Sequence, residues 1–140
     1  MKIITDTREQ LPYWTMDRRT LIVGDYTTPA LLGRFHIERK SLQDLYGTLT
    51  KGNGRFKAEL FRAAYHQIKI EVFVEGTHDD FINKRFPKGD ERKFHTDGLK
   101  RLIGTFERKY YLKFRWHKSR RACMAAVEKK LKAEEKSCRA

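Results

Sequence analysis

Two carboxylates and a lysine occur where neighbouring strands can bring them together. Successive side chains of a strand point to opposite faces, so a strand over residues 35–40 places Glu38 and Lys40 on the same face. Asp25 lies on the preceding segment and can come from the other strand of a hairpin. Two carboxylates bind a hard divalent cation such as Mg²⁺, and a lysine can neutralise charge on a phosphoryl group. These residues predict metal-assisted phosphodiester hydrolysis; an exposed strand with alternating charges is the alternative.

Hydrophobic periodicity predicts the strands and helices that position these side chains. Strands are expected at residues 2–5, 20–27, 33–40, 68–75 and 112–116. Helices are expected from Ser41, over 55–67, from Thr96 and over 119–136. The polar stretches 7–19 and 79–93 are expected to be irregular, with a short helix near Phe81. Strands that alternate with helices predict an α/β class with a mixed central β-sheet flanked by helices.

Local patterns add three expectations about these elements. Ser41-Leu42-Gln43-Asp44 has the spacing of a capping box at a helix start. Gly24 interrupts the segment before Asp25, which predicts a bulge or a close approach of two backbones. The residues of the two central helices that are expected to face inward are Phe56, Leu60, Phe61, Ala64, Leu99, Leu102, Ile103, Phe106 and Tyr110.

The composition indicates one folded domain over residues 1–140. There is no apolar run of the length that a membrane-spanning helix needs, and no apolar signal segment follows the first residues. We therefore expect a protein of the cytoplasm or nucleus that is not secreted. Cys123 and Cys138 lack the spacing of a zinc site, which fits a reducing compartment.

Positive charge is the strongest compositional signal. The chain has 31 Lys and Arg against 18 Asp and Glu, a net charge of +13, and most of the excess falls within residues 91–140. A basic field of this size favours a polyanion such as nucleic acid, and a solvated surface is the alternative. The residues of this part that we expect to bind DNA are Lys100, Arg101, Lys113, Arg115, Lys118, Arg120 and Arg121.

Three sequence blocks occur in order within the first third of the chain. They are Ile4-Thr5-Asp6-Thr7-Arg8-Glu9, Val23-Gly24-Asp25-Tyr26 and the run from Ile37 to Leu45, which contains Glu38-Arg39-Lys40 and Asp44. Together they resemble the XPF-type (ERCC4-domain) nuclease family, whose signature is DxRE followed by GD and ERKxxxD. The resemblance covers residues 2–75 best, and residues 91–140 form a basic helical part. It implies a restriction-endonuclease-like core.

The resemblance also implies roles for single residues. Asp25 and Glu38 would be the principal metal ligands, and Lys40 would be the catalytic lysine. Asp6 would complete the acidic cluster, either as a metal ligand or through a water. The full set that it places in the catalytic centre is Asp6, Arg8, Glu9, Asp25, Glu38, Arg39, Lys40 and Asp44. Arg8, Glu9 and Arg39 would support the acidic groups.

Other family positions leave alternatives open. Asp44 belongs either to the catalytic centre or to the helix cap with Ser41. Arg55 is either a phosphate contact or an ordinary exposed residue at a helix start. Glu59 occupies a position at which many members of the family carry glutamine, and we expect it to alter a polar contact without touching the metal.

The function implied by the resemblance is a Mg²⁺-dependent endonuclease, with Mn²⁺ able to substitute. Its substrate would be branched, flap or fork DNA in repair, recombination or replication. Family members usually carry a helix-hairpin-helix domain after the nuclease domain, and beyond residue 90 this chain has only Gly98 and Gly104 for such loops. We therefore expect a homodimer or protein partner to supply selectivity. The alternatives are a non-catalytic DNA-binding or partner subunit and, with least support, an RNA nuclease.

Overall fold

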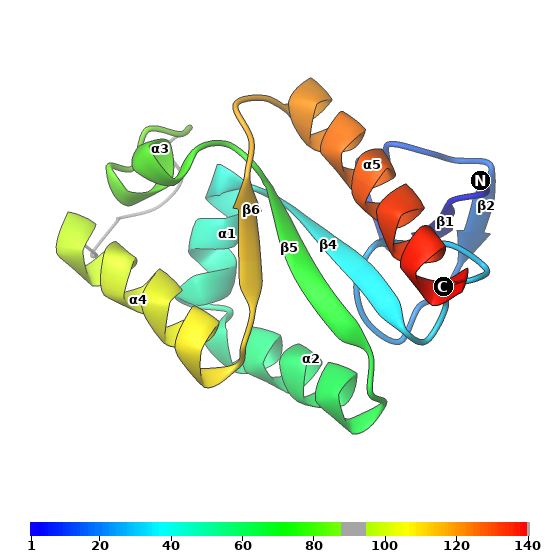
Figure 1. The fold of residues 1–140 in the computed structure, drawn as a ribbon. Helices are drawn as coiled ribbons and strands as arrows, with labels where there is room; N and C mark the ends of the chain where they lie inside the picture. Colours follow the sequence, from blue (N-terminus) through cyan, green and yellow to red (C-terminus); the bar gives the residue numbers. More distant parts are fainter. Residues whose placement is uncertain (88–94, 140) are drawn as a thin grey trace.

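A six-stranded mixed sheet forms the centre of the computed structural model, which describes residues 1–87 and 95–139. Its strand order is β2-β1-β3-β4-β5-β6 (Figure 1). The strands are β1 Ile4–Asp6, β2 Asp17–Arg19, β3 Tyr26–Thr27, β4 Phe35–Ser41, β5 Lys69–Glu75 and β6 Lys113–Trp116. β4, β5 and β6 run parallel, whereas β3 pairs antiparallel with both β1 and β4. The expected α/β class with a mixed central sheet is confirmed.

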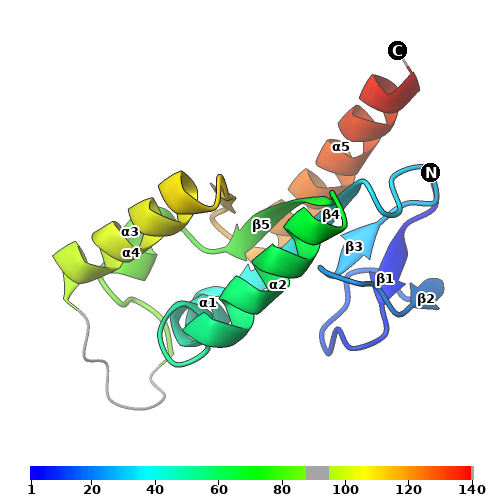
Figure 2. The ribbon, with the colours of Figure 1, turned by 90° about the horizontal axis from the view of Figure 1, so that it is seen from below.

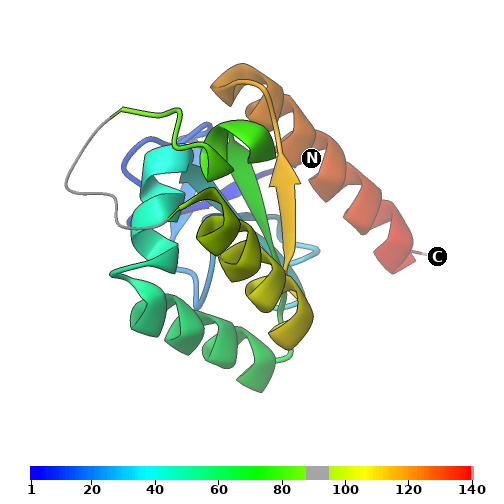
Figure 3. The same ribbon diagram turned by 90° about the vertical axis from the view of Figure 1, so that its left-hand side faces the viewer.

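Helices cover both faces of this sheet. They are α1 Leu42–Leu49, α2 Asn53–Tyr65, α3 His78–Ile82, α4 Thr96–Lys109 and α5 Arg120–Arg139. Helices α1 to α4 pack in one hydrophobic cluster with Ile70, Val72 and Val74 of β5, while α5 packs in a second cluster with Phe73. Figures 2 and 3 show α5 alone on its side of the sheet. No helix within the described residues is long and apolar enough to cross a membrane.

The N-terminal part of the sheet differs from the expectation. Residues 20–27 do not form one strand, because only Tyr26–Thr27 pair in β3. Gly24 interrupts the segment with a φ of +77°, and the amide of Asp25 donates to the Ile37 carbonyl at 2.8 Å. The stretch 7–19, expected to be irregular, contains β2. This strand lies at the edge of the sheet and is polar, so it carries no apolar alternation.

The inward face of α2 was also predicted wrongly at two positions. Phe61 is 73% exposed and Ala64 is exposed, while Ala63 is buried beside Phe56 and Leu60. On α4 the expected face is buried at Leu99, Ile103 and Phe106, which assigns that face to the core. The helix near Phe81 is present as α3, and residues 88–94 of the expected irregular stretch lie outside the described part of the chain.

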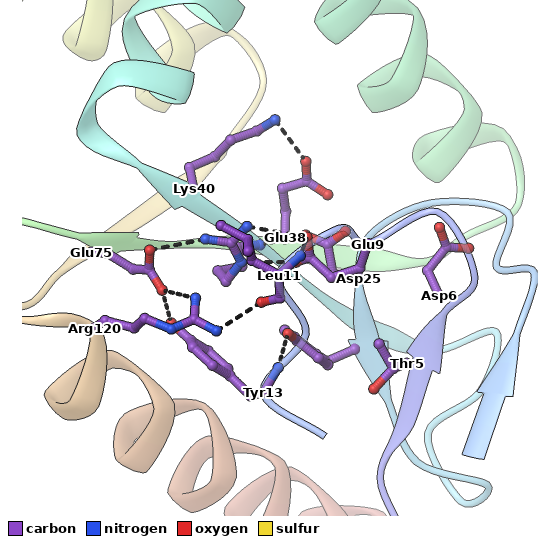
Figure 4. Close-up of polar contacts among 12 residues, drawn as sticks. Thr5, Asp6, Glu9, Leu11, Tyr13, Asp25, Glu38, Lys40, Glu75 and Arg120 are labelled. Atoms are coloured by element: carbon purple, nitrogen blue, oxygen red, sulfur yellow. Dashed lines mark hydrogen bonds and ion pairs between the residues drawn. The ribbon is translucent and has the colours of Figure 1, made fainter. Parts of the chain in front are cut away.

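A buried guanidinium ties the N-terminal segment, the sheet and α5 together. Arg39 of β4 forms ion pairs with Glu9 at 2.8 Å and with Glu75, at the end of β5, at 2.9 Å. Glu75 also accepts hydrogen bonds from the Tyr13 hydroxyl and from Arg120 (Figure 4). The Arg120 guanidinium lies 4.6 Å from the centre of the Tyr13 ring. We call Glu9, Tyr13, Arg39, Glu75 and Arg120 the Arg39 network.

We predict that Phe106→Ala lowers the free energy of unfolding by about 3–5 kcal/mol, because it opens a cavity in the core. Phe106 is 1% exposed and packs against Phe56. The control is Phe61→Ala, which removes an exposed ring and should change stability by less than about 0.5 kcal/mol. Denaturant unfolding followed by circular dichroism measures both, and equal losses would contradict the assignment of the core.

We predict that Glu75→Gln destabilises the protein by about 1.5–3 kcal/mol, because the neutral amide replaces a carboxylate that accepts charge-assisted hydrogen bonds. Glu107→Gln is the matched control, since Glu107 is an exposed residue of α4. The same unfolding measurement applies. If the two variants have the same midpoint, the Arg39 network contributes nothing to stability.

Candidate active site

One cavity of about 320 Å³ gathers the residues of the three sequence blocks. It lies between the segment after β1, the end of β4 and the helices α1 and α2. All eight residues that the resemblance places in the catalytic centre line it: Asp6, Arg8, Glu9, Asp25, Glu38, Arg39, Lys40 and Asp44. The remaining walls include Glu59 and Arg62 of α2, so α2 contributes two positions in addition to Asp44 of α1.

The backbone around Gly24 sets the position of Asp25. A Cβ atom at Gly24 would lie 3.1 Å from the Cβ atom of His36 and 3.2 Å from the Ile37 carbonyl oxygen. The positive φ and this close approach both favour glycine. Asp25 Oδ2 then accepts a 2.7 Å hydrogen bond from the backbone amide of Arg39. The turn thereby brings Asp25 against β4, next to Glu38.

Asp25 and Glu38 form a pair of carboxylates that repel one another. Burial, followed by the negative charge of Glu9, raises the pKa of Asp25 to about 7. Burial, followed by the charge of Asp25, raises the pKa of Glu38 well above its usual value. Positive charge that enters the cavity would stabilise the ionised forms of both groups. The pair therefore has the electrostatic character of a cation site.

Lys40 supplies one positive charge to this pair. Its Nζ atom lies 3.2 Å from Glu38 Oε2 (Figure 4). Burial by itself would lower the pKa of Lys40, but the charges of Glu38 and Asp25 outweigh it and raise that pKa. Lys40 is therefore held as an ammonium ion that can attract the oxygens of a phosphate group.

Asp6 lies in the same cavity with its oxygens already engaged. Arg8 donates to both of them, at 2.9 and 3.1 Å, and the backbone amide of Leu21 donates to Oδ1 at 2.7 Å. Burial would raise the pKa of Asp6, but these bonds outweigh it and hold the pKa below its usual value. Over residues 1–87 and 95–139, no group of three or more His, Cys, Asp or Glu side chains is arranged to hold a metal.

Glu9 and Arg39 support the carboxylate pair from behind. Arg39 donates to both oxygens of Glu9, at 2.8 and 3.1 Å, and both side chains are buried. Burial would raise the pKa of Glu9, but the Arg39 guanidinium outweighs it and lowers that pKa. This ion pair fixes the part of β4 whose backbone amide holds Asp25.

Asp44 lies both at the cap of α1 and in the wall of the cavity. Its backbone amide donates to Ser41 Oγ at 3.1 Å, which caps α1, and its side chain contributes to the cavity wall. A second cavity of about 530 Å³ adjoins the first and shares Lys40, Asp44 and Glu59 with it. Arg55 lines this second cavity and is not part of the first.

The basic residues of the C-terminal part lie outside the first cavity. Arg115 pairs with Glu71 at 2.5 Å, and Arg120 belongs to the Arg39 network. The others are exposed: Lys100 and Arg101 on α4, Lys113 on β6, Lys118 before α5 and Arg121 at its start. Arg120 also donates to the Leu11 carbonyl at 2.8 Å, and Leu11 lines the cavity. Lys118 and Arg121 are exposed cations that flank Arg120 along the chain.

Sequence reasoning did not place Glu59 and Arg62 in the cavity wall. The signal was available, because residues 55, 59 and 62 follow one stripe of α2 beside the buried stripe of Phe56, Leu60 and Ala63. The helix therefore turns one face to the core and an adjacent polar face to the two cavities.

Comparisons with known proteins identify the family and the fold. The pattern of the ERCC4 domain matches residues 2–129. Two solved structures of "XPF from Aeropyrum pernix", both 17% identical to this chain, have the same fold. The first has a TM-score of 0.69 and the match covers 94% of this chain and 64% of that chain. The second, described as a complex with DNA, has a TM-score of 0.71 and covers 96% and 65%.

The chain thus spans slightly less than two thirds of the length of those solved chains. No curated protein sequence matches it. The mixed six-stranded sheet with its flanking helices is the restriction-endonuclease-like fold of the XPF nuclease domain. Because the domain pattern spans nearly the whole described chain, this protein belongs to the ERCC4 domain family.

Proposed function

We propose that this protein is a divalent-cation-dependent endonuclease that hydrolyses phosphodiester bonds in DNA. The observation that carries the proposal is the cavity in which Asp25, Glu38 and Lys40 meet. Membership of the ERCC4 domain family and likeness to an XPF protein solved with DNA support DNA as the substrate. The high positive charge of the chain also supports a polyanionic substrate, because it attracts the phosphates of a nucleic acid.

Asp25 and Glu38 are the residues that would hold the cation, for which we propose Mg²⁺ with Mn²⁺ able to substitute. Mg²⁺ takes oxygen ligands and commonly binds through one or two carboxylates while keeping several waters. A pair of carboxylates with raised pKa values fits that requirement. When bound, the cation polarises a phosphoryl oxygen and lowers the pKa of a bound water. Asp6, engaged by Arg8, would act through water.

The remaining residues of the cavity would bind the DNA phosphates or hold Asp25 in position. Lys40, held as an ammonium ion by Glu38, places positive charge where a phosphate oxygen would approach. Arg8 is largely exposed at its side chain and Arg62 lines the wall, so both can contact the DNA backbone. Glu9 and Arg39 keep Asp25 in place through the backbone of β4.

We extend the proposal to branched substrates such as flaps and forks, acting in repair, recombination or replication within the cytoplasm or nucleus. The support for this step is the family resemblance. A homodimer or a partner subunit would supply selectivity, and the family resemblance is the support for this step too. The exposed cations Lys100, Arg101, Lys113, Lys118 and Arg121 would contact phosphates, with Arg55 lining the second cavity.

Asp25→Asn should lower the rate of DNA cleavage by at least about 100-fold, because the charge that binds the cation is lost. The assay compares labelled single-stranded, duplex, flap, fork and four-way-junction DNA in Mg²⁺, Mn²⁺ or EDTA. Fluorescence anisotropy in Ca²⁺ should show DNA binding within a few-fold of wild type, and Glu107→Gln should cleave normally. DNA binding by the wild type without cleavage in either metal would favour a non-catalytic DNA-binding or partner subunit.

Lys118→Glu with Arg121→Glu should weaken DNA binding and flatten its salt dependence. If each residue contacts one phosphate, the slope of log K against log salt should fall by about 2. The pair Arg34→Glu with Lys57→Glu gives the same change in net charge at exposed positions elsewhere. Anisotropy titrations over a range of salt concentrations measure the slope for each double variant. Equal slopes in the two double variants would contradict a role for the start of α5.

A further inference from the structure

Glu59 has a buried carboxylate oxygen that no described residue satisfies. Its Oε1 atom is inaccessible to solvent and has no hydrogen-bond partner within residues 1–87 and 95–139. Leaving such an oxygen unpaired is costly, because the water that would solvate it has been lost without replacement. A carboxylate in this state is expected to acquire a donor when the site is filled.

The position of Glu59 indicates where that donor would come from. Glu59 lines the cavity that holds Asp25 and Glu38, and it also lines the adjoining cavity. Its negative charge acts electrostatically on Glu38 and on Lys40. α2 therefore presents a further carboxylate to the cavity that holds Asp25 and Glu38.

Charge balance in the cavity favours a cation over a second protein donor. Asp6 and Glu9 are compensated by Arg8 and Arg39. Asp25, Glu38, Asp44 and Glu59 share the same cavity with Lys40 and Arg62. The uncompensated charge is about that of one divalent cation.

We propose that Glu59 is a further carboxylate of the cation site, which accepts hydrogen bonds from water bound to the divalent cation held by Asp25 and Glu38. This inference rests on the proposed function, because that function supplies the cation. Contact through water agrees with the absence, among the described residues, of three ligands arranged for direct binding. It also agrees with the preference of Mg²⁺ for keeping several waters. Glu59 would thereby orient water beside the scissile phosphate.

The test is Mn²⁺ binding to the DNA-free protein, followed through the electron paramagnetic resonance signal of free Mn²⁺. Glu59→Gln keeps the shape of the side chain and removes its charge. We expect it to weaken Mn²⁺ binding roughly 10- to 100-fold, the usual cost of losing an outer partner of a metal site. Glu107→Gln should bind as wild type, and Glu38→Gln should bind more weakly than Glu59→Gln.

Thermal unfolding in EDTA separates this role from a structural one. We expect metal-free Glu59→Gln to melt at or above the wild-type temperature, because the amide replaces a charged group that has one buried, unpaired oxygen. A lower melting temperature would assign Glu59 a structural role and overturn the proposal. Equal Mn²⁺ affinity in wild type and Glu59→Gln, with Glu38→Gln weakened, would overturn it while leaving the proposed function intact. If the wild type binds no Mn²⁺, or binds it no more tightly than Glu38→Gln does, the cation site itself is overturned.

Discussion

The arrangement of the candidate active site depends on how the guanidinium of Arg39 is compensated. A charge buried to this degree is stable only with partners of opposite sign, and Glu9 and Glu75 provide them from two different segments. Because Arg39 directly follows Glu38 in β4, fixing its side chain also fixes the backbone amide that holds Asp25. The contacts that compensate the buried charge of Arg39 therefore also set the position of the acidic groups.

This arrangement leaves the two faces of β4 with opposite electrostatic states. On the face toward Glu9 and Glu75, cations and carboxylates are matched in buried pairs. On the other face, Glu38 pairs with Lys40, and Asp25 approaches β4 from the turn before β3. The two carboxylates outnumber this ammonium group, and both have raised pKa values. Strand alternation lets one heptapeptide, Phe35–Ser41, serve both purposes. A well-paired interior thus supports a cavity that remains short of positive charge.

The sequence was most informative where a signal is local. Alternation in 35–40 predicted β4, Ser41 predicted the cap of α1, and the three blocks predicted residues that do line one cavity. It failed for β2, a polar edge strand, and for Phe61, because small differences in helix phase decide which neighbour is buried. The partners of Arg115 and Arg120 could not be predicted, since Glu71 and Glu75 meet them only through the arrangement of β5, β6 and α5.

The contact of Arg120 with Glu75 and Leu11 also determines when the site is completed during synthesis of the chain. The residues of the cavity all lie before position 63, yet the last member of the Arg39 network comes from the start of α5. While the ribosome still holds α5, Glu75 has only Tyr13 and Arg39 as partners within the network. The site is therefore closed late, after the parallel strands β4, β5 and β6 have been made. A nascent chain that stops earlier carries the acidic residues without the helix that secures them.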